Sequence, residues 1–234
     1  MSLEIEVKFL DADHAALRQH LTSLDALCLG RWFESNTVFD DEQRSLKATG
    51  TLLRLREKSG RFILTLKRAT DECTADMALG SSLDMAPDIL PENAELCAKI
   101  CHEHETDVDD AQSMRAILAG LGYTPALRYE KVREKWTLLG CEVCLDTLPF
   151  GDFVEIEGNE EDIRACAKAL ALPGEKAATA TYHDLNRQAR RAQGRQPDES
   201  FVFDDAVKSR LLARRATDMP EIAPAPLDTG PRSA

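Results

Sequence analysis

The sequence predicts an α+β protein built on a closed antiparallel β-barrel of about eight strands, with helices around the barrel. Short segments between residues 3 and 157 alternate charged and apolar side chains at period two, which is typical of strands with one charged and one apolar face. The helices that the sequence predicts are too few to cover the apolar side of an open sheet of that size. A barrel removes this difficulty, because its apolar faces turn outward to the helices while its charged faces line a lumen.

Composition narrows the class of protein. The chain has 234 residues, of which 43% are hydrophobic and 30% are charged, and this is enough for a sizeable core. Its formal charge of −12 argues against a general nucleic-acid binder, because such proteins need clustered lysine and arginine. No apolar run approaches the ~18 residues of a membrane span and no signal peptide precedes the first strand, so we expect a cytoplasmic protein without a membrane partner. The seven cysteines, an odd number, fit reduced thiols better than a disulfide framework.

The first third of the chain reads as strand, helix, strand and hairpin. Asp11 and Asp13 are typical helix caps, and the leucines that follow them recur at helical spacing. Alternating segments lie on both sides of this helix, and a glycine marks the turn of the later hairpin. The expected elements are a strand at residues 3–9, a helix at about 13–23, a strand at 31–40 and a hairpin of 51–57 with 62–67.

The same order returns after an insertion at about residues 69–98, which has little periodicity and to which we assign no chemistry. Glu103 and Glu105 repeat the spacing of Glu4 and Glu6, a capped helix follows, and a further strand comes next. We interpret this repetition as a diverged internal duplication. The remaining expected elements are strands at 129–136, 141–146 and 153–157, a helix that begins after Asn159, and a helix at 182–191.

Two parts of unequal size are expected along the chain. Residues 1–192 form one domain that contains the insertion, and residues 193–234 form a tail. Apolar residues at helical spacing between Val207 and Leu212 predict one short amphipathic helix in the tail, which would pack on the barrel or on a partner. The proline-rich end after Thr217 lacks this periodicity and is expected to be disordered.

The charged faces carry the functional signal, since acids and bases are nearly balanced on them. Unpaired charges inside a barrel are very costly, so the lumen must match acids to bases or hold ions that complete them. Carboxylates suit Mg²⁺ or Mn²⁺ and guanidinium groups suit phosphate oxygens, which together predict a site for a metal-bound polyphosphate. The acids are Glu4, Glu6, Glu103, Glu105, Asp146, Glu155 and Glu157, and the bases are Lys8, Arg54, Arg56, Lys67, Lys131 and Arg133.

These segments resemble the CYTH superfamily, the triphosphate tunnel metalloenzymes, which includes class IV adenylyl cyclases, thiamine triphosphatases and inorganic triphosphatases. Glu4-x-Glu6-x-Lys8 resembles the family signature, and later blocks follow in the family's order over about residues 1–185. These blocks are Leu53-Arg54-Leu55-Arg56, Thr65-Leu66-Lys67, Lys131-x-Arg133-x-x-Trp136, Leu145-Asp146 and Phe153-Val154-Glu155-Ile156-Glu157. The chain departs from the family in the length of the 69–98 insertion and at Cys101, where the resemblance leads us to expect a base.

The resemblance implies a role for each charged residue. A divalent cation, Mg²⁺ or Mn²⁺, would be held by Glu4, Glu6, Glu155 and Glu157. The triphosphate would be bound by the bases Lys8, Arg54, Arg56, Lys67, Lys131 and Arg133, which also stabilise charge on the transferred phosphorus. The catalytic residues would be Lys8, Glu103, Glu105 and Asp146. The two glutamates would help to position metal or water, and Asp146 would orient a basic neighbour or join the metal shell.

The resemblance also implies an enzyme that acts on a small-molecule triphosphate. We favour hydrolysis of inorganic triphosphate or of an organic triphosphate, because this reaction needs only a triphosphate site and nothing in the sequence marks an adenine pocket. One alternative is a class IV adenylyl cyclase, in which the ribose 3′-hydroxyl of ATP displaces pyrophosphate. Another is a module that binds polyphosphate or a nucleotide without turnover. The sequence leaves open whether the protein is a homodimer.

Overall fold

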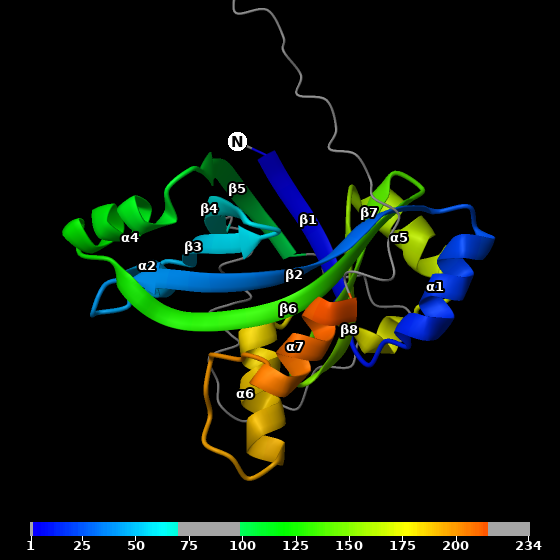
Figure 1. Cartoon of the computed structure of the whole chain (residues 1–234). Helices are drawn as coiled ribbons and strands as arrows, with labels where there is room; N and C mark the ends of the chain where they lie inside the picture. Colours follow the sequence, from blue (N-terminus) through cyan, green and yellow to red (C-terminus); the bar gives the residue numbers. More distant parts are fainter. Residues whose placement is uncertain (1, 70–98, 215–234) are drawn as a thin grey trace, which may run out of the picture.

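The computed structural model describes residues 2–69 and 99–214, and these form a closed barrel (Figure 1). Around the barrel the strand order is β1–β5–β4–β3–β2–β6–β7–β8, and β8 pairs again with β1. Every pairing is antiparallel, which confirms the predicted closed eight-stranded barrel. The strands are β1 (Ser2–Phe9), β2 (Leu27–Asp40), β3 (Thr51–Lys58), β4 (Arg61–Ala69), β5 (Lys99–Val108), β6 (Thr124–Leu138), β7 (Cys141–Leu148) and β8 (Gly151–Glu157), with a two-residue strand β9 (Ala177–Ala178) beside the end of β1.

Parts of the sequence-based description lie outside the described residues. The insertion expected at 69–98 falls there apart from its first residue, and so does the proline-rich end after Thr217. The division of the chain into a domain at 1–192 and a tail at 193–234 stays a prediction.

Three helices of the described residues begin directly after a capping side chain. Asp13 accepts hydrogen bonds from the backbone N–H groups of Ala15 and Ala16 and so caps α1. Asp110 and Asn159 cap α4 and α5 in the same way.

Nowhere in this part of the chain is a helix both long and apolar enough to cross a membrane. The helices are α1 (His14–Ser23), α2 (Ser45–Ala48), α4 (Ala111–Gly120), α5 (Glu160–Ala169), α6 (Tyr182–Ala192) and α7 (Asp205–Arg214), with a 3-10 turn at Gly174–Lys176.

The outward faces of the strands are apolar and pack against these helices. Phe9 of β1 is buried in one cluster with Leu21 of α1 and Ile163 of α5. Leu55 of β3 is buried in another cluster with Leu118 of α4. Figure 1 shows α1 and α5 together on one side of the barrel and α4 on the opposite side. Because side chains alternate along a strand, this apolar exterior turns the charged residues of the same strands toward the lumen.

One end of the lumen is closed by aromatic side chains, which we call the aromatic floor: Tyr129, Phe153, Tyr182 and Phe201. Tyr182 begins α6 and lies with its ring 5.2 Å from that of Phe153 on β8. Tyr129 of β6 and Phe201 of the tail lie 5.3 Å apart, and all four residues belong to one buried cluster. The aromatic floor therefore occupies the end of the lumen at which β8 and α6 begin.

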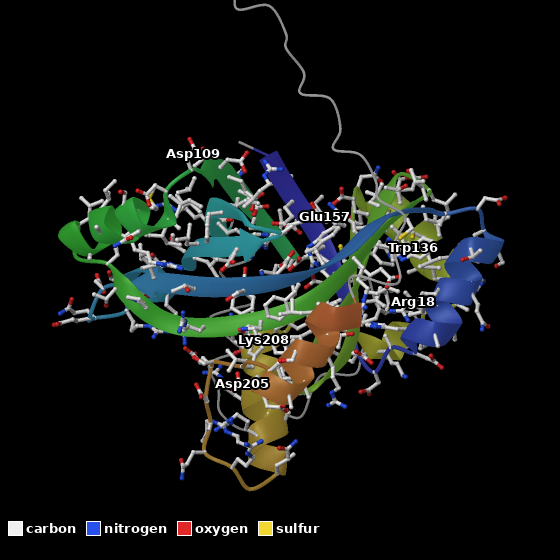
Figure 2. The ribbon with its side chains drawn as sticks, viewed as in Figure 1. Arg18, Asp109, Trp136, Glu157, Asp205 and Lys208 are labelled. Atoms are coloured by element: carbon white, nitrogen blue, oxygen red, sulfur yellow. The ribbon has the colours of Figure 1, made fainter. Side chains whose placement is uncertain are left out.

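The tail completes this end of the barrel. Strand β7 pairs with β6 only from Val132 onward, so the edge of β6 before that residue lacks a neighbouring strand of the barrel. Phe201 fills the gap, because its N–H donates to the Arg128 carbonyl at 3.1 Å and its carbonyl accepts from the Glu130 N–H at 2.9 Å. The predicted tail helix is present as α7, and it packs on the barrel through an ion pair between Lys208 and Glu130. Figure 2 shows Lys208 and Asp205 on this helix.

We predict that the tail contributes strongly to stability through Phe201. Its side chain is 4% exposed, so Phe201→Ala should lower the free energy of unfolding by about 3–5 kcal/mol, the usual cost of removing a buried aromatic ring. Val202 is 53% exposed in the same segment, and Val202→Ala should cost less than about 0.5 kcal/mol. Urea unfolding of both variants measures the difference. A loss for Phe201→Ala as small as the loss for Val202→Ala would contradict this role of Phe201.

Candidate active site

The register of the barrel places acids beside bases on the inward face. Lys8 of β1 lies opposite Glu155 of β8, and Arg133 of β6 lies opposite Asp146 of β7. The remaining charged residues named from the sequence lie on the same inward face of their strands, where Lys67 pairs with Glu4 and Arg54 with Glu105. The structure therefore brings all of them to the lumen, although they come from seven different strands.

Asp146 is fully buried and accepts hydrogen bonds from several donors at once. Its carboxylate accepts hydrogen bonds from Lys131 Nζ at 3.0 Å and from Arg133 Nε and Nη2 at 2.7 and 2.5 Å. The hydroxyl of Tyr182 donates to it at 3.0 Å. A carboxylate has about four lone-pair sites, so these donors occupy its accepting capacity. Of the two roles expected for Asp146, the geometry therefore favours orienting the bases over binding a metal.

Glu155 extends this group to Lys8. Lys8 Nζ lies 3.1 Å from Glu155 Oε1, and Arg133 bonds to the same carboxylate. Burial opposes ionisation of Glu155, but the ammonium of Lys8 and the guanidinium of Arg133 hold its pKa well below the usual range. Lys8 Nζ also lies 4.4 Å from the centre of the Tyr182 ring, so this charged group rests on the aromatic floor.

A second group of charges lies on β1, β3, β4 and β5. Arg54 donates to Glu105 at 3.4 Å, and Lys67 pairs with both Glu4 and Glu103, the latter at 3.3 Å. Burial would raise the pKa of Glu4, yet the ammonium of Lys67 outweighs it and lowers this pKa to about 2. In contrast, burial raises the pKa of Glu103, which lies near other carboxylates as well as near Lys67.

Glu157 lies among other acids. It is opposite Glu6 on β1 and opposite Glu142 on β7, and in the view of Figure 2 it lies between β1 and β2. Burial, with the charges of Glu4 and Glu142, raises the pKa of Glu157 to about 7. This part of the lumen therefore holds negative charge that the neighbouring bases do not fully balance.

The predicted metal ligands suit a hard divalent cation in their chemistry. Glu4, Glu6, Glu155 and Glu157 offer only carboxylate oxygens, which Mg²⁺ and Mn²⁺ prefer, and the raised pKa of Glu157 marks a place where a cation would be stabilised. Over residues 2–69 and 99–214, however, no three His, Cys, Asp or Glu side chains are gathered closely enough to hold a metal ion. Glu4 pairs with Lys67 and Glu155 with Lys8, so a metal would compete with these lysines.

The inward-facing residues that sequence reasoning missed include Glu34, Asn36 and Lys99. Glu34 is 1% exposed and lies 3.5 Å from Arg56, whose Nε donates to Asn36 Oδ1 at 3.1 Å. Glu34 and Asn36 are two residues apart in the segment 31–40, as inward-facing residues of a strand must be. Neither belongs to a repeated pattern of charges, so the sequence did not single them out. Lys99 borders the insertion, two residues before Cys101, and pairs with Glu6 at 3.5 Å. It supplies a base on the strand where one was expected at Cys101.

Comparison with known proteins points to one family. The model of the CYTH domain family matches residues 2–182. A protein from Methanocaldococcus jannaschii whose name proposes adenylate cyclase activity is 24% identical over 169 residues, which cover 72% of this chain and 83% of the relative. A Vibrio parahaemolyticus structure with a similar title has a TM-score of 0.59 at 20% identity, covering 77% of this chain and 95% of that one. The PH1012 protein from Pyrococcus horikoshii OT3 has a TM-score of 0.58 at 22% identity, with coverage of 76% and 96%. At these identities the solved structures show the shared fold alone.

We predict that Glu157 makes stability depend on pH. Because its pKa is raised from 4.5 to about 7, the folded protein binds this proton more tightly than the unfolded chain does, and stability is lost as pH rises from about 4.5 to about 7. Glu157→Gln has no proton to lose, so its stability should fall less over this range. Urea unfolding at a series of pH values, without divalent metal, measures the difference. The exposed Glu161 of α5 offers a control, since Glu161→Gln should keep the pH dependence of the wild type. Parallel curves for Glu157→Gln and the wild type would contradict the prediction.

Proposed function

The chain belongs to the CYTH domain family, and we propose that it is a divalent-metal-dependent hydrolase of a triphosphate bound in the lumen. One observation carries the proposal: bases from five strands, with Lys99 of β5 included, converge on a single enclosed space that also holds several carboxylates. Buried ion pairs of this kind stabilise a fold less than well-packed apolar residues of the same volume. Their number therefore supports a role in binding a highly charged ligand.

The ion pairs of the lumen suggest how such a ligand would bind. Lys67 and Lys8 are each engaged with a carboxylate, on Glu4 and Glu155. Phosphate oxygens would replace these carboxylates as the partners of the lysines, and the released carboxylates would turn to a divalent cation. Every buried charge keeps an opposite charge in this exchange, which avoids the cost of a lone ion in a low dielectric. Triphosphate and metal are therefore expected to bind together more tightly than either binds alone.

The bases would also act during the reaction. Phosphoryl transfer depends mainly on positioning and on stabilising charge at the transferred group, and guanidinium groups do this with paired N–H donors. Arg133 is held rigidly by two hydrogen bonds to Asp146, and Arg54 is held by the Tyr129 hydroxyl at 3.0 Å. A preorganised donor needs little rearrangement when negative charge develops, which is the main source of electrostatic catalysis.

The bound cation would neutralise phosphate charge and raise the reactivity of the terminal phosphorus. The residues that would hold it are Glu4, Glu6, Glu155 and Glu157. Glu103 and Glu105, on β5, would help to position water beside this group. Asp146 would keep Lys131 and Arg133 in place, since its own accepting sites are occupied.

The aromatic residues of the lumen support hydrolysis over nucleotide cyclisation. A cyclase must also hold adenine, and proteins commonly do so by stacking the base on an exposed aromatic face. Among the described residues, Trp32 of β2 has Lys58 Nζ 3.5 Å from its ring centre, and the rings of the aromatic floor pack on each other. These aromatic rings therefore already contact other side chains where adenine would have to stack. The second candidate, an adenylyl cyclase, is favoured by the name of the M. jannaschii relative. A module that binds without turnover is the third.

We expect the purified protein to release phosphate from inorganic triphosphate when Mg²⁺ or Mn²⁺ is present, and to lose this activity when the metal is chelated. ATP should give no cyclic AMP. Phosphate release and cyclic AMP are measured in parallel on the same preparation. Cyclic AMP with pyrophosphate as the products would establish the cyclase instead, and calorimetric binding of triphosphate without any product would establish the binding module.

We expect Arg56→Ala to weaken triphosphate binding. A hydrogen bond to a charged group contributes about 1.5–3 kcal/mol, so KM for triphosphate should rise roughly 10- to 150-fold. Arg61 on the adjoining strand provides a matched control, because its side chain is 71% exposed and pairs with Asp107 at the surface. Steady-state kinetics of Arg61→Ala should match those of the wild type. An unchanged KM in Arg56→Ala would remove Arg56 from the triphosphate site.

A further inference from the structure

Three buried polar atoms on the wall formed by β2 and β3 have no hydrogen-bond partner: Glu34 Oε2, Asn36 Nδ2 and Arg54 Nε. The three residues are 1%, 1% and 5% exposed. Several buried side-chain atoms of the described residues lack a hydrogen-bond partner, and Glu34 Oε2 is the one carboxylate oxygen among them. Buried polar groups are nearly always hydrogen-bonded, so these atoms indicate a place for a ligand.

The three residues lie on the same inward face of the wall. Glu34 and Asn36 are two residues apart on β2 and so share its inward face. Across the ladder to β3, Asn36 pairs with Arg56 and Val38 pairs with Arg54, which makes Asn36 and Arg54 diagonal neighbours on that face. Diagonal neighbours lie about 7–8 Å apart at the backbone, so their side chains reach one small group.

Glu34 is held with its second oxygen available. Trp32 Nε1 donates to Glu34 Oε1 at 2.7 Å, which fixes the orientation of the carboxylate. Oε2 lies 3.5 Å from Arg56 Nε and 3.9 Å from Lys131 Nζ, which are ion-pair contacts without a hydrogen bond. Burial would raise the pKa of Glu34, but Arg56 and Lys131 outweigh it and hold this pKa well below its usual range. An ionised carboxylate accepts hydrogen bonds and donates none, so the partner of Oε2 must be a donor.

Resting on the proposed function, we infer that Glu34 is a catalytic residue that binds the O–H of the attacking water. Asn36 and Arg54 donate to oxygens of the phosphoryl group that this water attacks. The wall thus binds both reacting groups, because it offers N–H donors to the phosphoryl oxygens and one carboxylate acceptor to the attacking water. This arrangement holds the water against the phosphorus, and orientation of a nucleophile is a major source of rate enhancement.

The step balances as an ordinary hydrolysis. The water oxygen forms a bond to the terminal phosphorus, and the bond from that phosphorus to the bridging oxygen breaks. The bridging oxygen leaves with the electron pair as part of diphosphate. One proton of the water passes to a product phosphate oxygen, while Glu34 remains ionised because Arg56 and Lys131 stay beside it.

Glu34→Gln tests the inference. Trp32 keeps the amide oxygen at the Oε1 position, so an amide N–H group takes the place of Oε2 and cannot accept the water's hydrogen bond. We expect kcat for inorganic triphosphate to fall roughly 100-fold, the usual effect of a misplaced reacting group. The Kd of a non-hydrolysable imidotriphosphate with Mg²⁺, measured by calorimetry, should not weaken. Glu57→Gln, on the exposed face of β3, should leave both values unchanged.

The same pair of measurements separates the other roles that Glu34 could have. A residue that only positions Arg56 and Lys131 would lose affinity for imidotriphosphate together with kcat, and that result would overturn the inference. An unchanged kcat would overturn it as well. Trp32→Phe provides a second test if Glu34→Gln does not fold, because it frees the carboxylate while keeping an aromatic ring. It should lower kcat without weakening the Kd, and an unchanged kcat or a weaker Kd would again overturn the inference.

Failure of the proposed function would look different. A wild-type protein that releases no phosphate from triphosphate refutes the hydrolase and this inference with it. A wild-type protein that is active, together with a Glu34→Gln variant that is equally active, refutes the inference and leaves the hydrolase in place.

Discussion

The cost of burying charge is the constraint on which this structure depends. An ion removed from water must find an opposite charge and hydrogen-bond donors or acceptors, or the fold becomes unstable. Asp146 meets this requirement with two bases and a tyrosine, and Glu155 meets it with Lys8 and Arg133. Because the register of the strands sets these residues opposite each other, the barrel tolerates an interior that in most proteins would be apolar.

The lumen changes in character along its length. On β6 the inward side chains run from Tyr129 at the floor to Lys131 and Arg133, and on β8 they run from Phe153 to Glu155 and Glu157. Bases with fixed partners lie close to the floor, where Lys8 and Lys131 approach the ring of Tyr182. Glu157, which pairs across the sheet with Glu6 and Glu142, lies further from the floor. The triphosphate and metal proposed above would therefore find both kinds of charge along the lumen.

Much of this arrangement could be predicted from the sequence because strands repeat at period two. Charges at i and i+2 must share a face, so the alternation by itself places Glu4 with Glu6 and Arg54 with Arg56. The near equality of acids and bases then indicates an enclosed space. Glu34 and Lys99 escape this reasoning, because each is an isolated charge and only pairing across strands gives it a partner.

The contacts that position the site are harder to foresee. The sequence singles out Asp146, but nothing near it in the chain shows that its oxygens are filled by donors from β6 and α6. The aromatic floor combines Tyr129, Phe153, Tyr182 and Phe201, which are up to 72 residues apart in the sequence. Contact among these four side chains depends on how the helices and the tail pack on the barrel. Period and propensity describe single elements, whereas such packing is decided by the whole chain.

The bridge between Phe201 and β6 also bears on the order in which the molecule can be completed. A ribosome releases the chain from its amino end, so the backbone of Arg128 and Glu130 emerges well before the segment that bonds to it. During that interval the unpaired edge of β6 is open to strands from other chains, and the base of the barrel is unsealed. The nascent protein is thus exposed to misassembly until Phe201 has been translated, and a chain that stopped before this residue would be expected to aggregate.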